Sequence, residues 1–125
     1  MSPNLVAAWV GFLLGSLAGL TTGLFFHGET WLGGYGSWRR RMIRLGHIAF
    51  FGLGFLNLGF AHTVQALGLT AGIALPSSLF IVGAATMPLV CYLSAYRKPF
   101  RNLFFIPALS VTIGVAAFLW RVITT

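Results

Sequence analysis

Two histidines in one apolar stretch are the residues of this chain best suited to chemistry. His47 and His62 are fifteen positions apart, so on a helix they would lie about 60° apart around the axis and about 22 Å apart along it. Imidazole is a common axial ligand of heme iron, and a single histidine would be enough for a chlorophyll magnesium. We take His47 and His62 as candidate ligands of a heme or chlorophyll. The alternative is that both form hydrogen bonds with neighbouring helices.

The two positions resemble the diheme cytochromes b of respiratory chains, in which paired histidines on two helices hold two stacked hemes. The resemblance covers these two residues. This chain has no second helix with a matching pair, because its third histidine, His27, lies at the edge of a loop. The resemblance therefore implies a second ligand from a partner chain or, for His47, from Met87 in an antiparallel helix.

Other chemistry is restricted by how few acidic residues and thiols the chain contains. Glu29 is the only acidic residue, which excludes catalysis by paired carboxylates and a hard-cation site built from several oxygen anions. Glu29 and His27 are either a proton-handling or quinone-binding pair or simply solvated loop residues. Cys91 is the only cysteine, so the chain forms neither a disulfide nor a thiolate zinc site. We expect no enzyme activity, no catalytic residue and no metal site.

The composition determines which elements must position these residues. Only 7% of the 125 residues are charged, 58% are hydrophobic, and the mean hydropathy is +0.89. Soluble domains carry about 25% charged residues, and a membrane helix needs about 20 apolar ones. We predict an all-α integral membrane protein: one domain, residues 1–125, with four transmembrane helices in an antiparallel up-down bundle. The predicted spans are residues 5–26, 39–67, 69–96 and 103–121.

The basic residues predict the orientation. The formal net charge is +7, and seven of the eight basic residues fall in two connections separated by an even number of spans, so they share one side. These are Arg39, Arg40, Arg41, Arg44, Arg97, Lys98 and Arg101. Basic loops favour the cytoplasm, so both termini should be outside a membrane, which we take to be a bacterial inner membrane. The same residues are candidates for binding lipid headgroups, and we expect no nucleic-acid partner.

Glycine recurs at every fourth position of the first span, at Gly11, Gly15, Gly19 and Gly23. Residues four apart share one face of a helix, and ridges of small residues let helices approach closely in lipid. The pattern predicts a packing face for a neighbouring helix, another subunit, or a flat ligand such as a carotenoid.

These observations favour a small non-catalytic subunit of an energy-converting membrane complex, respiratory or photosynthetic, with lipid and other membrane subunits as partners. One alternative is a heme- or chlorophyll-ligating membrane protein that uses His47 or His62. A second alternative is a small transporter or channel. For that role the spans offer only a thin supply of polar residues: Asn57, Gln65, Ser77, Ser78 and Thr86.

Overall fold

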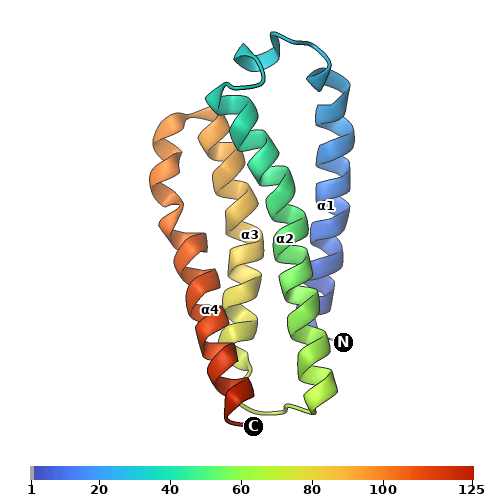
Figure 1. Cartoon of the computed structure of the whole chain (residues 1–125), viewed down its shortest axis with the longest axis vertical. Coiled ribbons are helices and arrows are strands. Elements are labelled where there is room, and N and C mark those ends of the chain that lie inside the picture. The colour runs from blue at the N-terminus through green and yellow to red at the C-terminus, as the bar shows by residue number, and fades with distance from the viewer. Residues whose placement is uncertain (1) are drawn as a thin grey trace.

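The computed structural model describes residues 2–125 and confirms an all-helical architecture with four long helices (Figure 1). These are α1 (Pro3–Phe26), α2 (Trp38–Leu67), α3 (Ala74–Tyr96) and α4 (Phe105–Ile123). Two short 3₁₀ helices, η1 (Trp31–Gly33) and η2 (Lys98–Leu103), lie in the connections. All four long helices belong to segments that are long and apolar enough to cross a membrane.

The helices contact one another mainly in chain order. The principal helix pairs are α1 with α2, α2 with α3, and α3 with α4, while α1 meets α3 over a shorter stretch. Both termini lie at one end of the molecule, and the η1 and η2 connections lie at the other (Figure 1). We call these the terminal end and the basic end, because the basic end carries seven of the eight basic residues.

Helices α2 and α3 form the centre of the molecule. In their most apolar windows 33% and 39% of the residues are buried, against 11% for the segments that contain α1 and α4. The core contains small side chains and a few large ones, among them Ala8, Phe60, Phe80 and Cys91. The outer helices therefore expose most of their apolar surface.

The start of α3 differs from the sequence-based prediction, which began this span at residue 69. Gly68 ends α2 in the left-handed conformation, with φ of 63°, and Gly72 also has a positive φ of 74°. Both conformations favour glycine, so the chain turns through residues 68–73 before α3 begins at Ala74. As a result Pro76 lies in the first helical turn, where proline is tolerated.

Candidate functional site

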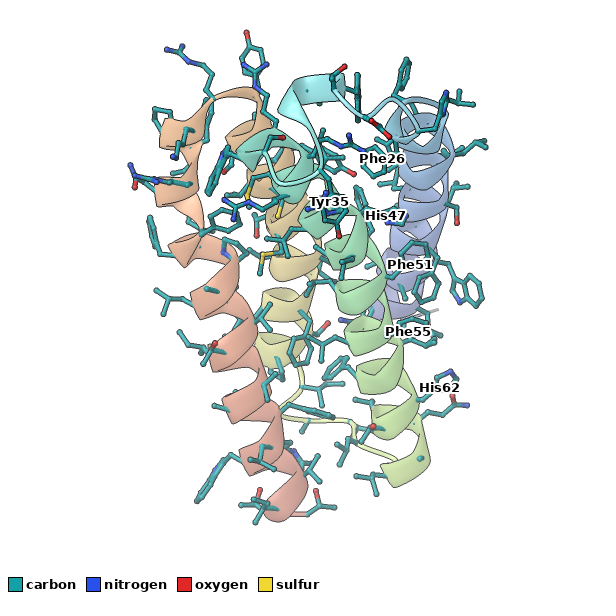
Figure 2. The ribbon with its side chains drawn as sticks, turned by 45° about the horizontal axis from the view of Figure 1, so that its top comes forward. Phe26, Tyr35, His47, Phe51, Phe55 and His62 are labelled. Carbon is teal, nitrogen blue, oxygen red and sulfur yellow. The ribbon has the colours of Figure 1, made fainter. Side chains whose placement is uncertain are left out.

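His47 lies against the first helix. A Cβ atom added to Gly19 would stand 2.6 Å from Nε2 of His47, so the imidazole occupies the space that this glycine leaves free. The ring of Phe51 meets the imidazole edge to face, with centroids 5.4 Å apart, and both residues lie on the side of α2 that is next to α1 (Figure 2). Because Nε2 faces the backbone of α1, this orientation of the ring leaves no room for a metal ion at Nε2.

His62 is placed quite differently. Its side chain is exposed and points away from the bundle, about half the length of α2 from His47 (Figure 2). The two histidines therefore do not converge on one site. Among residues 2–125, His, Cys, Asp and Glu side chains form no group of three that could hold a metal ion. His27 and Glu29 are exposed in the connection between α1 and α2.

The glycines of α1 face α2 along most of their length. An added Cβ at Gly11 would approach the Phe50 carbonyl oxygen to 3.2 Å, and one at Gly15 would approach the Phe50 Cβ to 2.9 Å. Gly23 differs, because nothing lies within 4 Å of its added Cβ. The two helices are thus in close contact from Gly11 to Gly15, and at Gly23 nothing of α2 lies near α1.

A buried polar cluster joins α1, α2 and α3 in the terminal half of the molecule. Asn4 and Asn57 are 1% and 0% exposed. The side-chain amide of Asn4 donates to Asn57 Oδ1 at 2.8 Å and to the Ser77 carbonyl oxygen at 3.2 Å, while the Ser77 hydroxyl donates to Asn4 Oδ1. The Asn57 amide donates to the carbonyl oxygens of Leu53, at 2.8 Å, and Phe80, at 3.2 Å. All four side-chain amide hydrogens of Asn4 and Asn57 therefore take part in hydrogen bonds.

Sequence reasoning singled out Asn57 and Ser77 but missed Asn4, because the first span was read from residue 5. The sequence did contain a local signal for an earlier helix start, at Ser2 and Pro3. The Ser2 hydroxyl oxygen accepts a hydrogen bond from the backbone N–H of Asn4, and Pro3 occupies the first helical position. A capping serine followed by proline marks a helix start, which places Asn4 inside α1.

Arg40 is a structural residue rather than a free surface charge. It is 4% exposed, and its guanidinium donates to the carbonyl oxygens of Phe26, at 2.9 Å, and Gly28, at 3.1 Å. The carbonyl of Phe26 belongs to the last turn of α1, which has no partner within the helix and carries the negative end of the helix dipole. The guanidinium also lies 4.8 Å from the centre of the Phe26 ring. Arg40 thus caps α1 from α2.

Aromatic rings hold three further cations at the basic end. The Arg44 guanidinium lies 3.9 Å from the centre of the Tyr35 ring and donates to the Tyr35 carbonyl oxygen at 2.9 Å. Trp38 donates its indole N–H to the Ser94 carbonyl oxygen at 2.8 Å, while Arg41 and Lys98 lie 5.8 Å and 5.1 Å from its ring. The exposed cations of this end are Arg39, Arg41, Arg97, Lys98 and Arg101.

No family model, no curated protein and no solved structure matches this chain. Functional arguments therefore rest on the geometry described above.

Proposed function

We propose that this chain is a small non-catalytic integral membrane subunit of a larger membrane complex. The proposal rests chiefly on the outer face of α1. Large apolar side chains recur there one or two turns apart and are 60–70% exposed: Trp9, Leu13, Leu20 and Leu24. The opposite face of α1 carries the glycines that meet α2. A helix with one face packed and one bulky apolar face is suited to a second helical partner.

The interior of the molecule supports a non-catalytic role. Two of the buried polar side chains, those of Asn4 and Asn57, use all their amide hydrogens in hydrogen bonds to α2 and α3. Groups bound in this way hold helices together and are not free for proton transfer or for lining an ion path.

The energy-converting complexes, respiratory or photosynthetic, are the hosts that we propose, by analogy with other small helical subunits. We place the chain in a bacterial inner membrane, with both termini outside and the basic end in the cytoplasm, following the positive-inside rule. The exposed cations of the basic end would then meet the anionic lipid surface of the inner leaflet.

Purification from the native membrane in a mild detergent tests this proposal. The tagged chain should bring down a defined set of other membrane subunits in fixed ratio. Replacing Leu13 and Leu20 of the exposed α1 face by alanine should reduce their recovery while the chain still folds, since neither side chain lies in its core. Recovery of the chain alone, under conditions that keep other complexes intact, would contradict the proposal.

The exposed position of His62 favours one second candidate function. An outward-facing imidazole near the terminal end could ligate a chlorophyll or heme held against a partner subunit. The absorption spectrum of the purified complex distinguishes this function. A pigment band that His62→Leu removes, and that His47→Leu leaves in place, would support it.

A further inference from the structure

An apolar groove runs between α2 and α4 in the terminal half of the molecule. Its volume is about 360 Å³, within the range of about 300–1,000 Å³ that is usual for small-molecule sites. Three phenylalanines form its base, one from each neighbouring helix. Phe60 of α2 meets Phe80 of α3 and Phe118 of α4 edge to face, with ring centroids 5.3 Å and 4.6 Å apart.

The groove is open and apolar because of two residues of α2 on its side, Gly59 and Thr63. Gly59 has no side chain, and an atom added there would find nothing within 4 Å. Thr63, one turn further on, donates its hydroxyl to the Gly59 carbonyl oxygen at 2.7 Å. Its polar hydrogen is therefore bound within α2, and the groove surface is hydrocarbon and aromatic ring. Leu119 of α4, which is 57% exposed, forms the opposite rim.

Arg121 adds a positive charge beside this groove, on α4 between the lining residues Leu119 and Val122, although it does not line the groove itself. It follows the lining residues Phe118 and Leu119 on α4, and its Nε–H donates to the Ala71 carbonyl oxygen in the turn between α2 and α3 at 2.8 Å. A second bond, to the Thr125 hydroxyl at 2.8 Å, also holds the guanidinium. Arg121 is the only basic residue of the terminal end, and the only acidic residue, Glu29, lies at the basic end. No acidic side chain therefore lies near enough to neutralise it.

We propose that this groove binds one phospholipid of the leaflet at the terminal end, with an acyl chain along the phenylalanine base and an anionic headgroup beside Arg121. The apolar groove matches a hydrocarbon chain in shape and polarity. The uncompensated guanidinium matches the headgroup phosphate in charge. The inference does not depend on the proposed subunit role, because every residue involved belongs to this chain.

Photocrosslinking in nanodiscs tests the inference. The full chain is reconstituted with phosphatidylglycerol that carries a diazirine in its acyl chain, and adducts are located by mass spectrometry. They should concentrate on Phe55–Thr63 and Val115–Val122. Gly59→Leu should remove most of them, because the leucine fills open space without a clash. Gly52→Leu is the matched control, since Gly52 also has open space around it and lies two turns away on α2, outside the groove.

The headgroup is tested separately with phosphatidylcholine that carries the same diazirine. The wild-type chain and Arg121→Lys should prefer phosphatidylglycerol in the groove, and Arg121→Gln should lose that preference while it keeps groove adducts. Equal labelling by the two lipids in the wild-type chain would overturn the headgroup assignment. Adducts spread evenly over the outer surface would overturn the groove itself. A third outcome would also overturn the groove assignment. If nanodiscs made from native membrane gave no adducts in the groove, a second copy of the chain or another subunit would cover it.

Discussion

The side-chain amide of Asn4 donates a 2.8 Å hydrogen bond to the side-chain oxygen of Asn57, which lies 53 residues further along the chain. This bond fixes how far α1 can slide along α2. The glycines of α1 repeat every four residues, so a shift by one repeat would still present glycine to α2. The same shift would leave buried amides without partners, which costs about 1–3 kcal/mol per group. The glycines thus allow close approach, and the asparagines select one register.

Replacing Asn57 by leucine should lower the free energy of unfolding in detergent micelles by about 1–3 kcal/mol, because Asn4 then keeps a buried donor without its acceptor. Asn4→Leu should have a similar effect. The double variant should cost less than the sum of the two, since both changes remove the same bond. Thr86→Val is the control, because the Thr86 hydroxyl bonds only within its own helix. Strict additivity would contradict the network.

Leucine substitutions along the α1 glycines should have graded effects. Gly15→Leu should be the most disruptive, because its Cβ alone would lie 2.9 Å from Phe50 Cβ, and overpacking typically costs about 1–3 kcal/mol. Gly19→Leu should cost less, because its obstacle is the tip of the His47 side chain, which can rotate. Gly23→Leu should be tolerated. Thermal unfolding in micelles would show the order, and equal melting temperatures for all three variants would argue that α1 does not pack on this face.

Loss of Arg40 should destabilise the chain far more than loss of the neighbouring arginine. Arg40→Gln removes two hydrogen bonds to the end of α1, and interactions of this kind with a helix dipole contribute up to about 2 kcal/mol when partly buried. Arg40→Lys should not restore stability, because an ammonium lacks the planar fork that reaches two carbonyls. Arg39→Gln should be nearly neutral, since Arg39 is exposed. Urea titration of the three variants makes the comparison, and similar losses for Arg39 and Arg40 would contradict the capping role.

Both termini should lie on the periplasmic side. A reporter that is active only in the periplasm should work when fused after Thr125, and one that requires the cytoplasm should not. The reverse result would place the seven basic residues of the basic end outside. Removing the charges of Arg97, Lys98 and Arg101 together should weaken the orientation, whereas Arg121→Gln should leave it unchanged.

Hydropathy was sufficient to predict four helices, but not where the third begins. Leu69 and Ile73 are apolar and extend the hydrophobic run, although the backbone there already turns through Gly68 and Gly72. Hydropathy averages over many residues and carries no information about φ. The positive φ of each glycine becomes visible only once the helices on both sides are placed.

The sequence also could not distinguish among the arginines of the basic end. Arg39, Arg40 and Arg41 are adjacent and chemically identical, but successive residues point about 100° apart around a helix. Only Arg40 reaches the end of α1, because the α1–α2 packing turns that face of α2 toward it. Similarly, helical period places Asn57 on one face of α2 without showing that Asn4 and Ser77 arrive at the same depth. Contacts of this kind, between residues far apart in the sequence, depend on tertiary packing.

The polar cluster has a consequence for the order of events during synthesis. Asn4 leaves the ribosome before its partner Asn57, which follows only after the connection at the basic end, and Ser77 comes later still, at the start of α3. During insertion the nascent first helix therefore carries an unmatched amide, which hydrocarbon does not solvate. The hydrogen bonds of the Asn4 side chain to α2 and α3 can all form only when α3 has emerged, so α1 is made before the contacts that secure it.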